Sequence, residues 1–151
     1  GFVNSGRLSL PAIYDGSPLT VDEDPTFPAA MRPGSPAIDA PIESDGRPGW
    51  LLPALGSGFT LLLAAGDEVR RESLHAALAD LPVPVMVRTV GLGHDADLFD
   101  RDGLVTRRYD LWPGTGYLFR PDQHVVGRWR VVRPETVRAA VLRAIGREAH
   151  R

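Results

Sequence analysis

Proline is concentrated at the beginning of the chain, and this constrains the fold more than any other feature of the sequence. Nine of the 14 prolines lie within residues 1–53. Proline fixes φ and has no N–H donor, so this stretch can hold no long helix and little central sheet. Charge divides at nearly the same place. Residues 1–58 carry seven acidic residues and three arginines, whereas residues 59–151 carry 12 and 14. We therefore predict an extended segment followed by a regular α/β unit.

Apolar patterning after residue 58 predicts an alternation of strands and helices. The run at 59–65 is short and nearly all apolar, as expected of a buried strand, and 83–90 is interpreted as a second, parallel strand. Between them, apolar residues recur at helical spacing over 67–81, and Pro82 ends that helix. The two strands and the helix therefore make a βαβ unit.

The rest of the chain continues this alternation. A short helix is predicted at 100–109, with Asp100 or Asp102 as its cap, and residues 116–130 have the pattern of a hairpin. The last helix begins at Pro134, a favourable first-turn residue. The resulting order, β-α-β-α-β-β-α, is the thioredoxin order. We therefore predict a thioredoxin-like, three-layer α/β/α fold with a mixed central sheet, preceded by an extended proline-rich segment.

The chain contains no cysteine and no lysine, and all 17 of its basic residues are arginine. Disulfides, thiolate ligands, cysteine nucleophiles and lysine Schiff bases are therefore excluded. A redox-active thioredoxin fold places its cysteine where the first helix begins, because the helix dipole lowers the thiol pKa there. Residues 64–68 read Ala-Ala-Gly-Asp-Glu in that region, and Thr115-Gly116 stands where a cis-proline usually precedes the third strand. We predict no thiol redox activity.

Other candidate metal, cofactor and catalytic sites lack the residue spacing or the partner residues that such sites need. Counted from Asp95, the acidic loop lacks the glycine and the final glutamate of a calcium site, and His94 is its only candidate zinc-binding histidine. The glycine pair in 56–58 precedes a strand, whereas a dinucleotide-binding glycine loop follows one. The four histidines and the serines have no recognisable catalytic partners. We therefore predict no catalytic residue, no cofactor site and no metal site.

Aromatic residues gather in the last third of the chain. Packing in the core and the hairpin is the simpler interpretation. A protein interface is the sharper one, because tryptophan and tyrosine combine a large contact area with a polar group. The candidate interface residues are Tyr109, Trp112, Tyr117 and Trp129. Trp112 is the best of them, because it lies in a Pro/Gly turn that can project from the surface.

Charge and hydropathy limit the classes of partner. No stretch approaches the ~20 apolar residues that a membrane helix needs, and no signal peptide is visible. The formal net charge of -2 argues against a nucleic-acid-binding surface dominated by charge. We therefore expect a cytoplasmic protein with neither a membrane nor a nucleic acid as its partner.

Five short motifs, spread along the chain, are considered together. Residues 14–18 read Tyr-Asp-Gly-Ser-Pro, 31–37 read Met-Arg-Pro-Gly-Ser-Pro-Ala, and 45–48 read Asp-Gly-Arg-Pro. Residues 55–62 read Leu-Gly-Ser-Gly-Phe-Thr-Leu-Leu, and 119–129 run from Phe-Arg-Pro-Asp to Gly-Arg-Trp. This set resembles the C-terminal, thioredoxin-like domain of FAD-dependent aromatic hydroxylases, which include phenol hydroxylases and aromatic polyketide hydroxylases.

The resemblance implies a domain without chemistry of its own. In that family FAD and NAD(P)H act in a preceding catalytic part, whose motifs this sequence does not contain. Residues 1–30 would be the connector from that part, and 31–151 the accessory domain. Its partner would be the catalytic FAD and substrate domain of the same parent chain, with a homodimer contact as a further use.

Two alternatives remain open from the residues. One is a free-standing protein-binding module on a degenerate thioredoxin or peroxiredoxin scaffold, which would meet its partner through Trp112 and the hairpin. The other is an enzyme that holds a metal ion at the acidic cluster between Asp95 and Asp102.

Overall fold

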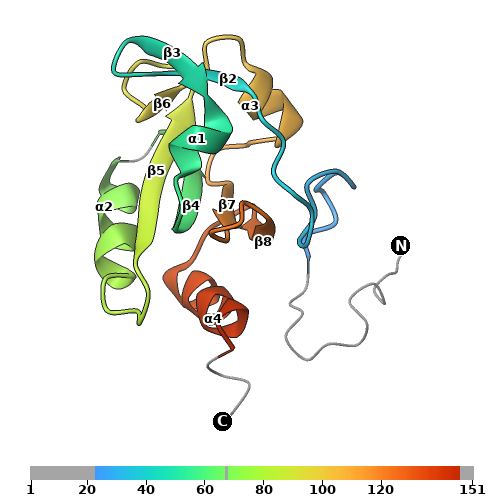
Figure 1. Cartoon of the computed structure of the whole chain (residues 1–151), viewed down its shortest axis with the longest axis vertical. Helices are drawn as coiled ribbons and strands as arrows, with labels where there is room; N and C mark the ends of the chain where they lie inside the picture. The colour runs from blue at the N-terminus through green and yellow to red at the C-terminus, as the bar shows by residue number, and fades with distance from the viewer. Residues whose placement is uncertain (1–22, 67, 147–151) are drawn as a thin grey trace.

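The computed structural model describes residues 23–66 and 68–146 of the chain. Eleven elements follow one another along these residues: β2 (Pro41–Ser44), β3 (Arg47–Trp50), α1 (Leu51–Leu55), β4 (Phe59–Ala64), α2 (Glu68–Ala77), β5 (Val85–Gly91), β6 (Leu98–Phe99), α3 (Leu104–Arg108), β7 (Gly116–Phe119), β8 (Val125–Trp129) and α4 (Pro134–Ala144). Figure 1 shows how these elements surround one sheet. The sheet has seven strands in the order β3-β2-β6-β5-β4-β7-β8.

The centre of the sheet is the predicted βαβ unit. β4 and β5 run parallel, with Phe59 opposite Val85 and Ala64 opposite Val90. On its other side β4 pairs antiparallel with β7, and β7 pairs antiparallel with β8. The predicted hairpin and the mixed character of the sheet are therefore both confirmed.

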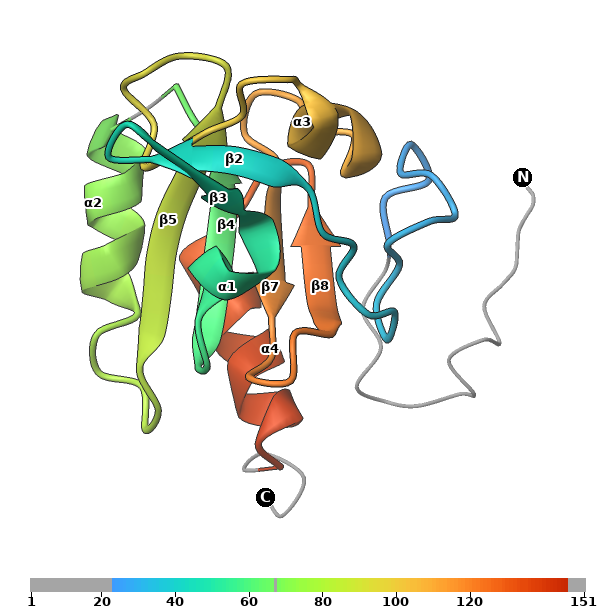
Figure 2. The same cartoon turned by 45° about the horizontal axis from the view of Figure 1, so that its top comes forward.

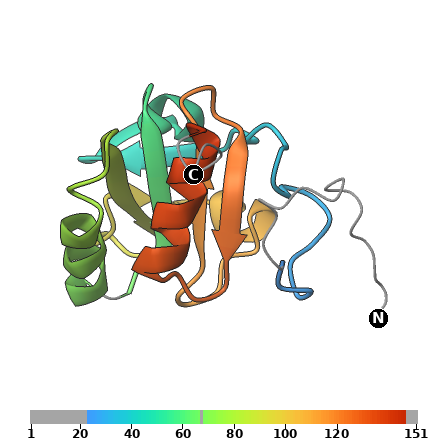
Figure 3. The same ribbon diagram turned by 90° about the horizontal axis from the view of Figure 1, so that it is seen from below.

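Alternating side chains of β4 supply two cores, one on each face of the sheet. Leu62 faces the core that includes α1 and α3, whereas Leu61 and Leu63 face the core that includes α2 and α4. The two pairs of helices therefore cover opposite faces (Figure 2, Figure 3). The predicted three-layer α/β/α architecture is confirmed.

Two helices differ from their predicted bounds. α2 ends at Ala77, four residues before the predicted end, although Leu78 and Leu81 stay buried in the turns that follow. α3 begins only at Leu104, because residues 101–103 form a turn. The N-cap residue is Gly103, not the predicted Asp100 or Asp102, but Asp100 still serves the first turn: its carboxylate accepts hydrogen bonds from the backbone N–H groups of Val105 and Thr106, at 3.1 and 2.7 Å.

The proline-rich stretch contributes a hairpin that was not predicted. β2 and β3 lie at one edge of the sheet, joined by Asp45 and Gly46, which have φ values of 54° and 77°. Positive φ at both positions is the requirement of a tight hairpin turn, and Asp-Gly meets it. Pro48 lies in the outermost strand, where a missing N–H costs least. The prolines therefore permit an edge hairpin while excluding central strands.

The segment before β2 is part of the packed unit from its first described residues. Phe27 and Met31 are buried and belong to the core under α1 and α3. Farther along, Gly34 and Ser35 exchange backbone hydrogen bonds with Val125, each 2.8 Å long, at the free edge of β8. The packed unit therefore extends upstream of the predicted boundary at residue 31, while residues 1–22 of the predicted connector lie outside the described residues.

None of the described helices is long and apolar enough to cross a membrane.

Candidate functional site

The edge of the sheet where β4 and β5 end is the place at which a redox thioredoxin carries its cysteine. Here Ala65 follows β4, and its N–H donates to the carbonyl of Val90 at 2.8 Å. Thr115 is fully buried before β7, where its carbonyl accepts the N–H of Ala64 at 2.9 Å. The Thr115 hydroxyl also accepts the N–H of Trp112 at 3.1 Å. The threonine at the cis-proline position therefore holds the 112–115 loop.

A hollow of about 280 Å³ opens at this edge. It is lined by Leu63, Ala64, Ala65, Gly66, Arg70, Thr89, Pro113, Gly114 and Val131. We call it the β4-edge hollow. Most of these residues are apolar or small, and none of them is a thiol or an activated hydroxyl. The hollow therefore suits contact with another apolar surface.

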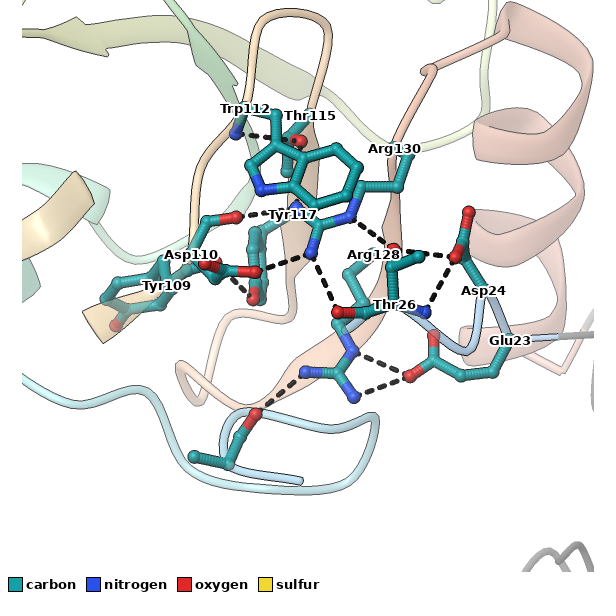
Figure 4. Close-up of polar contacts among 11 residues, drawn as sticks. Glu23, Asp24, Thr26, Tyr109, Asp110, Trp112, Thr115, Tyr117, Arg128 and Arg130 are labelled. Carbon is teal, nitrogen blue, oxygen red and sulfur yellow. Dashed lines mark hydrogen bonds and ion pairs between the residues drawn. The ribbon is translucent and has the colours of Figure 1, made fainter. Parts of the chain in front are cut away.

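Beside this hollow, a buried arginine ties together three separate segments of the chain. Arg130 is only 8% exposed, and its guanidinium carbon lies 3.8 Å from the Phe27 ring centroid and 3.7 Å from that of Trp112. Figure 4 shows this guanidinium beneath the indole of Trp112. It donates to the Asp110 carboxylate at 2.6 Å and to the Thr26 hydroxyl at 2.9 Å. Arg130 thus joins the N-terminal segment to the loop before β7.

A second arginine, on β8, holds the same N-terminal segment. Arg128 is 5% exposed, and its Nε donates to a carboxylate oxygen of Glu23 at 2.6 Å. Another of its nitrogens donates to the carbonyl of Ala30 at 2.7 Å, and its guanidinium lies 4.7 Å from the Phe27 ring. Burial raises the pKa of Glu23 above its ordinary value, against the opposite effect of Arg128. We call Arg128, Arg130, Glu23, Thr26 and Phe27 together the arginine clamp.

The arginine clamp holds residues 23–30 in place, because a buried arginine without partners raises the free energy of the folded state. Removing a guanidinium from water costs several kcal/mol, which only close acceptors and ring faces offset. Most of these partners for Arg128, and several for Arg130, come from residues 23–30. Displacing this segment would leave Arg128 without its carboxylate partner Glu23 and would leave Arg130 only its partners in the loop before β7.

Two of the predicted interface residues lie in the core. Tyr109 and Tyr117 are both 0% exposed, and their rings meet edge to face at 5.1 Å. The Tyr109 hydroxyl donates to the carbonyl of Ile38 at 2.6 Å and accepts its N–H at 3.0 Å. The Tyr117 hydroxyl donates to the carbonyl of Tyr109 at 2.8 Å. Burial raises the pKa of both tyrosines, so both remain protonated donors.

The other two interface candidates have accessible surface. Trp112 is 45% exposed beside the β4-edge hollow, and Trp129 is half-buried against the core under α2 and α4. The structure therefore does not bring all four residues to one surface. The interface remains a prediction that depends on Trp112 and Trp129.

The arginine clamp itself was not predicted. Its partners are about 100 residues apart, so no local pattern in the sequence connects Glu23 with Arg128. The available signal was the run Arg128-Trp129-Arg130, in which period-2 alternation places both arginines on the same side of the extended chain. The buried Phe27 gave no signal because it stands among prolines and acidic residues.

The acidic loop uses its carboxylates for local structure. Asp97 accepts the N–H of Thr89 at 3.0 Å, and its own N–H donates to the Thr89 hydroxyl at 2.9 Å. Asp100 is fully buried and accepts hydrogen bonds from backbone N–H groups in the first turn of α3. Over the described ranges 23–66 and 68–146, no group of three or more histidine, aspartate or glutamate side chains is arranged to hold a metal ion.

No protein-family model and no curated protein sequence matches the chain. Two solved flavoenzymes are similar to it. The flavin-dependent monooxygenase PieE, solved with FAD and substrate, is 28% identical over 88% of this chain, with a TM-score of 0.66. Aklavinone-11 hydroxylase, solved with FAD and aklavinone, is 25% identical over 70% of this chain, with a TM-score of 0.59. This chain spans only 24% and 19% of the lengths of these two proteins.

A peroxiredoxin has the same fold. PrxQ of Xylella fastidiosa, solved as a cysteine-to-serine mutant, is 17% identical, with a TM-score of 0.54 over 82% of this chain and 99% of that protein. At this identity the likeness shows the fold alone. The chain therefore has a thioredoxin-like fold and resembles the C-terminal domains of FAD-dependent aromatic hydroxylases. It contains no cysteine and so has no thiol redox activity.

Proposed function

We propose that this thioredoxin-like chain is the accessory domain of an FAD- and NAD(P)H-dependent aromatic monooxygenase, and that it docks on the catalytic part of the same parent protein. The observation that supports this best is the likeness to PieE, which extends over 88% of this chain and only 24% of that monooxygenase. A match that covers most of one chain and only a small part of the other is typical of one domain compared with a larger enzyme. The work of the domain is contact and stability.

The β4-edge hollow supports a role in contact. It occupies the position at which the fold otherwise carries its reactive thiol, and Ala64, Ala65 and Gly66 fill that position here. Large apolar side chains stand exposed at the same edge, with Leu92 64% exposed and Val131 56% exposed. Exposed apolar surface of this kind is typical of interaction sites. The docking residues in this proposal are Trp112 and Trp129, together with the hollow.

The cofactors belong to the rest of the parent protein. PieE and aklavinone-11 hydroxylase are both solved with FAD, and each is more than four times as long as its match to this chain. In the proposed parent, the catalytic part binds FAD and NAD(P)H and hydroxylates an aromatic substrate. This domain supplies a docking face, which a homodimer could also use.

A purified sample of the chain tests the absence of its own flavin chemistry. We expect a colourless protein that, mixed with FAD and NADPH, oxidises NADPH no faster than free FAD does. A stoichiometric flavin that remains bound through gel filtration would contradict the proposal. The upstream reading frame tests whether the chain belongs to a larger flavoenzyme. A glycine-rich FAD motif there supports the proposal, whereas a start codon near Gly1 supports a free-standing binding module.

A further inference from the structure

A second hollow lies beside the β2–β3 turn and the loop that connects β5 with β6. It encloses about 310 Å³ and shares no lining residue with the β4-edge hollow. Binding sites for small molecules begin at about 300 Å³, so its size fits a small molecule. We call it the Arg88 hollow. The lining residues that carry its chemistry are Glu43, Asp45, Arg88, His94, Asp97 and Phe99.

Arg88 brings a cation to this hollow that the protein does not neutralise. β6 pairs with β5 only at Val90 and Gly91, so the edge of β5 beside Arg88 is left open. The side chain is half-buried, and within residues 23–66 and 68–146 its buried Nε has no hydrogen-bond partner. Arg128 and Arg130, by contrast, each donate to several acceptors. An anionic group in the hollow would supply the acceptor that Arg88 lacks.

Two of the three carboxylates in the lining already have a cation beside them. An oxygen of Glu43 accepts a hydrogen bond from the Arg101 guanidinium at 3.0 Å. An oxygen of Asp97 lies 3.9 Å from Nε of Arg71. These two carboxylates are therefore partly neutralised by arginines that do not line the hollow.

Asp45 is the third carboxylate, and it has no ion-pair partner in the part of the chain that the structure describes. It is exposed in the β2–β3 turn, where its φ of 54° fixes its place. Asp45 and Arg88 line the same hollow without forming an ion pair with each other. One charge of each sign therefore remains for a ligand that carries both.

A pair of stacked rings forms part of the wall between these charges. The rings of His94 and Phe99 have centroids 4.1 Å apart and planes inclined by 31°. Both residues line the hollow. Aromatic faces offer apolar contact, which suits the carbon chain of a ligand whose polar groups lie at its ends.

We propose that the Arg88 hollow binds a small zwitterion, an aliphatic molecule with one carboxylate and one ammonium group. The carboxylate meets Arg88, the ammonium group meets Asp45, and the carbon chain lies against His94 and Phe99. A dianion such as phosphate fits less well, because its second charge would lie among the three carboxylates of the lining. This inference goes beyond the proposed docking role and does not depend on it.

An NMR titration of the chain with simple probes tests the requirement for both charges. Glycine, β-alanine, γ-aminobutyrate and δ-aminovalerate form a series with increasing separation of the two charges, and butyrate and butylammonium carry one charge each. We expect one member of the series to shift the amide signals of residues 88 and 94–97 to saturation. Its affinity should be about tenfold higher than that of either single-charge probe, because each of those lacks one ion pair. No saturable shift with any member, or equal affinity for butyrate or butylammonium, would overturn the proposal.

Two variants assign the charges to their residues. Arg88→Gln and Asp45→Asn should each weaken binding of the best probe by about tenfold, because each removes one charge. Asparagine tolerates the positive φ of residue 45, so this variant keeps the turn. Arg133→Gln is the matched control, since Arg133 is exposed at the start of α4 and does not line the hollow. Equal affinity in Arg133→Gln and in either hollow variant would overturn the proposal.

Discussion

At the scale of single residues, Arg130 connects segments that are far apart in the sequence. Its guanidinium lies between two aromatic rings and donates to acceptors on the N-terminal segment and on the loop before β7. Arg138 offers a contrast on the surface, since it pairs with Asp80 while its side chain is 35% exposed and that of Asp80 is 76% exposed. The two arginines therefore separate the effect of burial from the effect of charge.

We expect Arg130→Ala to lower the free energy of unfolding by about 3 kcal/mol, because it leaves partly buried acceptors without their donor and removes the cation between the Phe27 and Trp112 rings. Arg138→Ala should lower it by less than about 1 kcal/mol, as is usual for an exposed ion pair. Urea unfolding of the two variants and the parent chain measures the difference. Equal losses would show that the buried cation does not hold the segment.

Tyr109 gives a second prediction at this scale. Its hydroxyl satisfies both the carbonyl and the N–H of Ile38, whereas the Tyr117 hydroxyl satisfies one carbonyl. Tyr109→Phe should therefore destabilise the domain by about 1–3 kcal/mol, and Tyr117→Phe by less. Thermal unfolding followed by circular dichroism ranks the two. The opposite order would contradict the hydrogen-bond assignment.

At the scale of elements, the turn of the β7–β8 hairpin contains a shifted carboxylate. The Arg120 guanidinium donates to both oxygens of Asp122, at 3.1 and 2.7 Å. These hydrogen bonds lower the pKa of Asp122 from 3.8 to about 2. A lowered pKa means that the stabilising effect of this carboxylate is present above about pH 4 and is lost as the pH falls through about 2.

A carbon-detected NMR titration of the carboxyl groups measures this shift. We expect Asp122 to titrate near pH 2 in the parent chain. In Arg120→Gln, which keeps a polar side chain but removes the charge, the pKa of Asp122 should return toward 3.8. An unchanged pKa in the variant would assign the shift to another cause.

The elements with strong periodicity were predictable from the sequence. The apolar run of β4 and the helical stripes of α2 and α4 depend on local spacing, and the sheet and its layers follow from their order. The β2–β3 hairpin was missed because the surrounding prolines obscured the Asp45-Gly46 turn signal. β6 was missed because two residues carry no period.

The candidate site was less predictable than the fold. Loss of the thiol position follows from composition alone, because no cysteine exists anywhere in the chain. The arginine clamp depends on contacts between residues about 100 positions apart, which one sequence does not encode in any local pattern. Tyr109 and Tyr117 were grouped with Trp112 by residue type, and burial separates them.

At the scale of the whole molecule, a thioredoxin-like scaffold has kept its sheet and layers without its thiol. The edge that would carry the reactive group is an apolar hollow, and the N-terminal segment is fixed beside it by two buried arginines. The likeness to PieE places this arrangement in the context of a flavoenzyme more than four times as long as the match. These features support a domain that acts through contact.

The measurement that tests this account most directly is the distribution of flavin in the protein made from the whole reading frame. The purified protein is cut by limited proteolysis within residues 1–22, and the fragments are separated under conditions that release the domain while the flavin stays bound. The account predicts a yellow intact protein, flavin absorbance that stays with the upstream fragment, and a colourless fragment containing residues 23–151. Flavin that travels with residues 23–151, or an intact protein without flavin, would contradict it.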